Sequence, residues 1–82
     1  MITLAEVAAQ IATTSNSLLG TSLLFEIGDS LARGMFMYVE GDEAELEKFR
    51  KFAAKNLKKK MKHNEHCAAD ENGGACDYYH FT

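Results

Sequence analysis

The segment of residues 42–62 constrains the fold most, because its apolar and charged residues recur at helical spacing. Asp42 can cap the first turn, and Glu45 three residues later completes a capping box. Acidic residues fill the first turn and basic residues the last, as the helix dipole favours. The apolar positions share one face: Leu46, Phe49, Phe52, Ala53, Leu57 and Met61. We therefore predict a long amphipathic helix over residues 42–62.

The opposite face of this predicted helix is basic. Residues 48–62 carry eight basic residues and no acidic one, although the whole chain has a net charge of −3. Such a face can contact phosphates or an acidic protein surface, and it can equally be a solvated helix face. Because the chain is acidic overall, a protein partner is at least as well supported as a nucleic acid. The candidate partner contacts recur three or four apart: Lys48, Lys51, Lys55, Lys58, Lys59 and Lys62.

Acidic residues dominate the first part of the chain. Residues 1–47 contain eight of them, and their only basic residue is Arg33. A negative surface of this kind can steer a positively charged partner, and we take Glu40, Glu43 and Glu47 as candidate contacts. Helix capping and solubility account for the same residues, so this reading stays open.

Two elements are expected before the long helix. Thr3 and Glu6 form a capping box for an N-terminal helix, which the polar run at residues 13–17 should end. Apolar residues then alternate along two segments, which predicts a β-hairpin with strands near residues 22–27 and 35–40. The alternative is a helix over residues 17–33, which would make the fold a small all-α bundle.

The first helix also resembles part of a known DNA-binding motif. The segment "TLAEVAAQIATTSNSLL" is similar to the first helix and turn of a lactose-repressor-type helix-turn-helix protein, and the similarity covers about 17 residues. The matching residues are Thr3, Leu4, Val7, Ala8, Ile11 and Leu18. It departs from the motif at the turn, where Ala12 and Thr13 replace a glycine and an apolar residue. The segment expected to read DNA contains no basic residue, so the resemblance implies no DNA contact there.

The tail at residues 63–82 gathers all three histidines and both cysteines. If the tail is helical on both sides of its glycine loop, four ligands could bind zinc as a stabilising metal: His63, Cys67, Cys76 and His80. If it is instead a hairpin turning near residues 71–72, Cys67 faces Cys76 and His63 faces His80. These two pairs would then lie roughly 13 Å apart, which excludes a shared metal and favours a Cys67–Cys76 disulfide. Free thiols in a mobile tail are the third reading.

Size and composition set the remaining expectations. Eighty-two residues make a single domain, residues 1–82, and we expect the α+β class: helix, hairpin, long helix and a C-terminal strand or stapled loop. The sequence has no bilayer-length apolar run and no leader pattern, so we expect no membrane contact and a cytoplasmic location. Dimerisation through residues 35–40 is left open.

No catalytic motif stands out, so we expect a non-enzymatic interaction protein with no required cofactor. Compact acidic chains of this kind are typical of phage or mobile-element inhibitors of host proteins, including anti-defence proteins. The alternative function is a nucleic-acid-binding module that uses the lysine-rich helix, with zinc as its stabilising metal.

Overall fold

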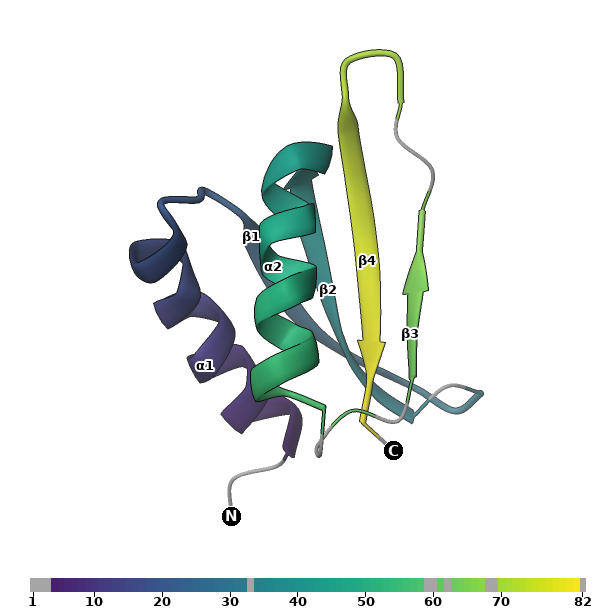
Figure 1. Ribbon diagram of the computed structural model, residues 1–82. Coiled ribbons are helices and arrows are strands. Elements are labelled where there is room, and N and C mark those ends of the chain that lie inside the picture. Colours follow the sequence, from purple (N-terminus) through teal and green to yellow (C-terminus); the bar gives the residue numbers. More distant parts are fainter. Residues whose placement is uncertain (1–3, 33, 59–60, 62, 68–69, 82) are drawn as a thin grey trace.

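The computed structural model describes residues 4–32, 34–58, 61, 63–67 and 70–81 of the 82-residue chain. The described elements are the helices α1 (Leu4–Leu19) and α2 (Glu43–Asn56) and the strands β1 (Leu24–Ser30), β2 (Gly34–Asp42), β3 (His63–His66) and β4 (Gly74–His80), as Figure 1 shows. The strands form an antiparallel sheet in the order β1-β2-β4-β3. The α+β class is therefore confirmed, and the all-α alternative is wrong.

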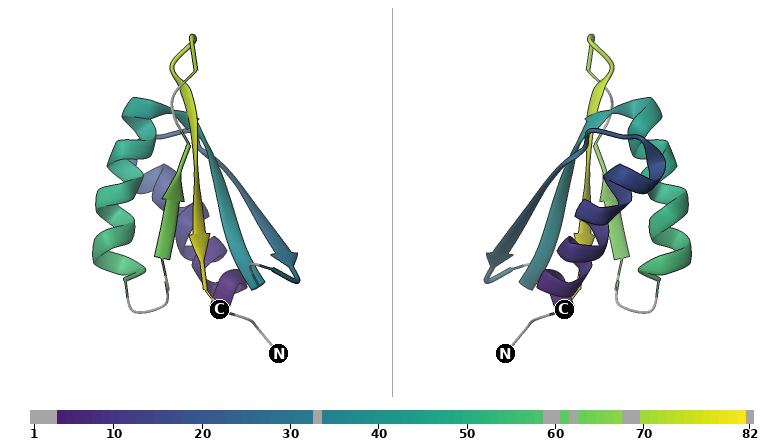
Figure 2. Two further views of the ribbon diagram at one scale, coloured as in Figure 1. Left: turned by 90° about the vertical axis from the view of Figure 1, so that its right-hand side faces the viewer. Right: turned by 90° about the vertical axis from the view of Figure 1, so that its left-hand side faces the viewer.

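The molecule has two layers, because both described helices pack on one face of the sheet (Figure 2). Alternation along the strands sends Met37, Val39 and Tyr79 into the layer between sheet and helices, where they are buried. Phe49 of α2 lies at the centre, with its ring centroid 5.2 Å from that of Phe25 and 5.6 Å from that of Tyr79. The predicted apolar face of α2 is confirmed by the buried residues Leu46, Phe49, Ala53 and Leu57.

Helix α1 runs past the polar segment that was expected to end it. Thr13, Thr14 and Ser15 are helical, and their hydroxyls donate to main-chain carbonyls three or four residues earlier instead of breaking the helix. The helix ends at Leu19. The next residue, Gly20, has a φ of +68°, and the Thr21 N–H donates to the Asn16 carbonyl as in a Schellman motif. The expected stop at residues 13–17 was therefore wrong.

The predicted hairpin is confirmed, with longer strands than expected. Residues 24–30 pair with residues 34–42, so that Glu26 lies opposite Tyr38 and Gly28 opposite Phe36. The rival helix over residues 17–33 is excluded, because residues 21–23 are not helical and Leu24–Ser30 form strand β1. The same strand occupies the place of the second helix of a helix-turn-helix, so the resemblance of α1 does not extend to that fold.

Helix α2 is shorter than the predicted 42–62. It begins at Glu43, ends at Asn56, and Leu57 is its C-cap residue. The expected capping box does not form, because Asp42 makes no side-chain cap hydrogen bond and Glu45 instead accepts a hydrogen bond from the Ser22 N–H. A row of like charges beyond residue 55 disfavours further helical turns, since lysines four apart repel one another.

Candidate functional site

The cysteine–histidine tail forms the β3–β4 hairpin. His63 lies opposite His80 in the register, and the Cys67 N–H donates to the Cys76 carbonyl. Cys67 and Cys76 form a disulfide, with their Cα atoms 5.2 Å apart. This is the disulfide alternative, and it leaves neither sulfur as a metal ligand. Within the described residues no group of three or more His, Cys, Asp or Glu side chains could hold a metal ion.

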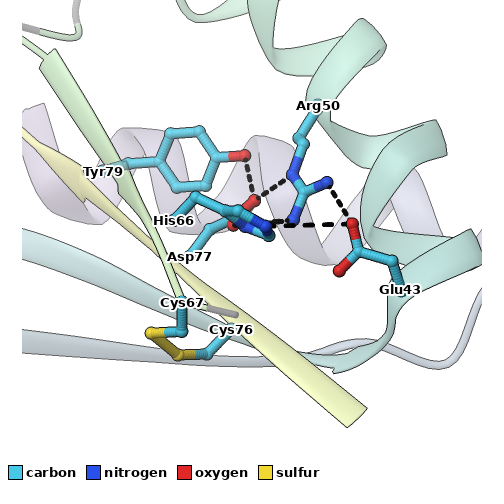
Figure 3. A network of polar contacts seen from close by, with 7 residues as sticks. All are labelled: Glu43, Arg50, His66, Cys67, Cys76, Asp77 and Tyr79. Atoms are coloured by element: carbon cyan, nitrogen blue, oxygen red, sulfur yellow. Dashed lines mark hydrogen bonds and ion pairs between the residues drawn. A yellow bond between two sulfur atoms is a disulfide. The ribbon is translucent and has the colours of Figure 1, made fainter. Parts of the chain in front are cut away.

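Asp77, next to the disulfide, is the centre of a polar network that joins β4 to α2 (Figure 3). Its carboxylate is fully buried and accepts two hydrogen bonds from Arg50, with Nε–Oδ2 and Nη2–Oδ1 distances of 2.8 and 3.0 Å. The Tyr79 hydroxyl donates to Asp77 Oδ2 at 3.1 Å, and His66 Nδ1 lies 2.9 Å from Oδ1. Arg50 also contacts Glu43 Oε1 through Nη1 at 2.7 Å.

Charge pairing decides the ionisation of these groups. Burial opposes the charged form of Asp77, but hydrogen bonds from Arg50 and His66 outweigh it and lower the pKa of Asp77. The Arg50 hydrogen bond likewise lowers the pKa of Glu43, and burial raises the pKa of Tyr79. The cluster is thus an ion network that fixes α2 on the hairpin, and within it Glu43 Oε1 is paired while the buried Glu43 Oε2 accepts no hydrogen bond from the described residues. Glu43, a predicted partner contact, is held in this network.

The predicted lysine face is only partly described. Lys48, Lys51 and Lys55 lie on α2 with exposed side chains, and Lys58 is exposed just beyond its end. Lys59 and Lys62 lie outside the described residues. Glu47 is also exposed on α2, one helical turn before Lys51. The described lysines therefore lie on the helix layer and just beyond the end of α2.

The face of the sheet away from the helices carries an aromatic cluster. Glu26, Tyr38, Tyr78 and Glu65 lie opposite one another across β1, β2, β4 and β3 and form one transverse row. The ring centroids of Tyr38 and Tyr78 are 5.1 Å apart, and those of Phe36 and Tyr78 are 5.7 Å apart. We call this surface the sheet face and define it by Glu26, Phe36, Tyr38, Glu40, Tyr78 and Glu65.

Carboxylates border the aromatic rings of the sheet face. The Tyr38 hydroxyl donates to Glu40 Oε2 at 3.2 Å, and partial burial together with this hydrogen bond raises the pKa of Tyr38. Glu65 Oε1 lies 3.0 Å from His80 Nε2, and His80 is buried. Glu40 is the predicted acidic contact that the fold brings to this cluster, whereas Glu47 lies on the helix layer.

Two depressions lie on the sheet face, one on each side of Tyr38. The first has a volume of about 330 Å³ and is lined by Glu26, Ile27, Gly28, Phe36, Tyr38 and Tyr78. The second has a volume of about 300 Å³, and its lining includes Tyr38, Glu40, Asp70 and the disulfide cysteines. Among the described residues that line them are three carboxylates and no lysine, arginine or histidine.

The sequence contained a signal for this surface, which the prediction used for the strand and for a possible dimer contact but not to tell its two faces apart. In "MFMYVE", Met35, Met37 and Val39 alternate with Phe36, Tyr38 and Glu40. Period-two alternation puts the second set on the face away from the core. What sequence reasoning lacked was the partner strand, because Tyr78 lies 40 residues further along the chain and joins Tyr38 only through the β2–β4 pairing.

Comparisons with known proteins assign no family to this arrangement. No family model, curated protein or solved structure matches the chain. Among the described residues, no helix has the length and apolar character needed to cross a membrane. The surfaces described above are therefore the basis for a functional proposal.

Proposed function

We propose that this chain is a small non-enzymatic protein that binds a macromolecular partner, and that the partner is a protein seated on the sheet face. The observation that supports this proposal is the cluster of Phe36, Tyr38 and Tyr78 on the face without helices. An antiparallel sheet commonly leaves one face to water, and polar residues then cover that face. Aromatic residues are instead enriched where proteins bind one another, since they supply large contact areas with little loss of conformational entropy.

The described polar network supports a binding role over a catalytic one. Arg50 is already paired with both Asp77 and Glu43 through hydrogen bonds and ion pairs. Groups paired in this way hold the fold, because turning them toward a substrate would leave the buried Asp77 charge without its partner. The two depressions are open and carry carboxylates next to phenol rings, an arrangement suited to recognition.

A nucleic-acid partner is the second candidate, and Lys48, Lys51 and Lys55 on α2 favour it. Three exposed lysines on one helix give a short electrostatic footprint that would contact phosphates without reading bases. That surface lies on the helix layer, so variants can separate it from the sheet face.

Two narrower expectations belong to the same proposal. We expect the partner to be a host protein, in particular a defence protein inhibited by a phage or mobile-element product. We also expect a cytoplasmic location, which cell fractionation tests directly. The Cys67–Cys76 disulfide argues against a cytoplasmic location, because disulfides persist mainly in oxidising compartments.

Affinity capture with two matched double variants tests the proposal. Tyr38→Ser/Tyr78→Ser removes both rings of the sheet face, whereas Lys51→Glu/Lys55→Glu reverses charge on α2. We expect the tyrosine variant to lose the captured protein and the lysine variant to retain it, with circular dichroism showing that both are folded. Retention by the tyrosine variant with loss by the lysine variant would refute a sheet-face interface. Binding to random DNA that weakens steeply with salt, and that the lysine variant abolishes, would establish the second candidate.

A further inference from the structure

We infer that the partner segment on the sheet face is basic and extended, and that two of its arginine or lysine side chains occupy the depressions on either side of Tyr38. This inference rests on the proposed function, since it names the chemistry of the partner that the sheet face would bind. The evidence is the coincidence, at each depression, of an aromatic wall and a carboxylate.

The first depression has the composition of a cation-binding site. Glu26 lies directly opposite Tyr38 in the register, so its carboxylate is a neighbour of that phenol ring. Gly28 leaves the space that the Phe36 ring fills, because a Cβ atom at Gly28 would lie 2.3 Å from Phe36 Cζ. A guanidinium or ammonium group entering here meets π-faces and one negative charge, and both attract it.

The second depression repeats the same chemistry on the far side of Tyr38. Glu40 and Asp70 supply two carboxylates, and Tyr38 is the ring that both depressions share. The Asp70 carboxylate is fixed in place, because its Oδ1 accepts hydrogen bonds from the Asn72 and Gly74 N–H groups, both at 2.9 Å. Glu40 is fixed by the Tyr38 hydroxyl. Ordered carboxylates lose less conformational entropy on binding than mobile ones.

The spacing of the depressions sets the spacing of the cations. Phe36 lines the first and Glu40 the second, and both lie on β2 with their side chains on the same face. Positions four apart on a strand are separated by about 13 Å. An extended peptide that runs along β2 would therefore place cations at residues i and i+4, with residue i+2 over Tyr38.

Charge argues against the other occupants of this face. A second copy in a two-fold dimer would bring the same carboxylate-bearing surface against itself, and like charges at an interface disfavour association. A phosphate group would meet the same carboxylates. Charge complementarity therefore favours a basic protein segment over a second copy of this chain or a nucleic acid.

A peptide titration tests the inference. The probe is the peptide Ac-Arg-Gly-Ser-Gly-Arg-NH2, and the control has both arginines replaced by citrulline, which keeps the shape and removes the charge. The readout is the amide NMR signals of Gly28 and Gly41, which lie at the first and second depressions. We expect the citrulline peptide to bind at least about tenfold more weakly, and added salt to weaken binding of the arginine peptide.

Charge-neutralising variants locate the sites. Glu26→Gln and Glu40→Gln should each weaken binding of the arginine peptide by up to about fivefold, as for exposed ion pairs. Glu6→Gln, an identical change at an exposed position of α1, should have no effect. Equal binding of both peptides, binding of neither, or an equal effect of Glu6→Gln would overturn the inference. If the peptides fail but Tyr38→Ser/Tyr78→Ser still loses the captured protein, the proposed function stands and only the basic partner is wrong.

Discussion

Replacing Arg50 by methionine should reveal how much of the stability depends on the polar network. The substitution keeps an unbranched side chain at this position of α2 but removes both hydrogen bonds from the guanidinium to Asp77. Tyr79 and His66 remain near the carboxylate, and neither supplies the permanent charge that Arg50 does. The variant therefore leaves a buried carboxylate without its cation.

The burial of the two side chains indicates how much unfolding free energy Arg50→Met should lose. Removing one partner of a buried ion pair costs about 3–5 kcal/mol, because the other charge stays desolvated. The Asp77 side chain is fully buried, whereas 24% of the Arg50 side chain is exposed, so we expect the lower end, about 3 kcal/mol. With an m-value of about 1 kcal/mol per M urea, the unfolding midpoint should fall by about 3 M.

The pH dependence gives a sharper test than the magnitude. In the wild-type protein the pKa of Asp77 is lowered, so its contribution is present above the unfolded pKa of about 4 and is lost as pH falls through the folded pKa. Without Arg50, burial dominates and raises the pKa of Asp77. The contribution of Asp77 is then complete below pH ~4 and is lost as pH rises through the folded pKa. The stability difference between the two proteins should thus be largest near neutral pH and narrow toward pH ~4.

Urea unfolding monitored by circular dichroism at several pH values measures this difference. Asp77→Asn provides the control, since Arg50→Met in that background should give a difference independent of the ionisation of residue 77. A difference between wild type and Arg50→Met that stays constant from neutral pH to pH ~4 would refute the assignment of the cost to a buried charge. A cost no larger than that of Glu43→Gln, which removes only the more exposed contact of Arg50, would refute the conclusion that the Arg50–Asp77 pair fixes α2 on the hairpin.

Three further perturbations test other parts of the fold. Cys67→Ser/Cys76→Ser should lower the free energy of unfolding by about 3 kcal/mol, the chain-entropy value for a loop of this size. Reduced wild-type protein should show a similar loss of thermal stability, and equal melting temperatures with and without reductant would contradict this prediction. Gly28→Ala should cost about 1–3 kcal/mol in urea unfolding, because the new methyl group overlaps the Phe36 ring, and an unchanged midpoint would show that the ring moves freely. In an alkaline titration followed by tyrosinate absorbance, Tyr79 should ionise only when the protein unfolds, because its pKa is raised in the folded state. Its contribution to folding stability is lost as pH rises above about 10, and ionisation of Tyr79 in the folded protein would contradict this.

The elements that the sequence predicted are those whose pattern is local. The alternation of Met35, Met37 and Val39 predicted a strand, and the spacing of Leu46 and Phe49 predicted a helix, because each pattern needs only the chain's own periodicity. The end of α2 was missed because residues 57–62, which directly follow Asn56, contain no glycine or proline to mark it.

The parts of the site that the sequence could not supply depend on distant residues. Arg50 looked like one more cation in a basic row, and its pairing with Asp77, 27 residues away, follows only from packing α2 against β4. The Cys67–Cys76 pairing was one of three open readings, and the hairpin register decides among them. The transverse row of Glu26, Tyr38, Tyr78 and Glu65 likewise needs the strand order β1-β2-β4-β3, which local patterns do not encode.

The register of β4 links the stabilising network to the sheet face. Asp77 and Tyr79 point toward the helices while Tyr78 points away, so a slip of one residue would bury Tyr78 and expose the charged centre of the network. Contacts at the hairpin end oppose such a slip, since the disulfide fixes Cys76 to Cys67 and the Glu43 N–H donates to the Gly73 carbonyl. The Arg50–Asp77 pair opposes it from the helix layer. If the sheet face binds a partner as proposed, the buried Arg50–Asp77 pair should support that binding by keeping the strand in register, although the pair lies on the other side of the sheet.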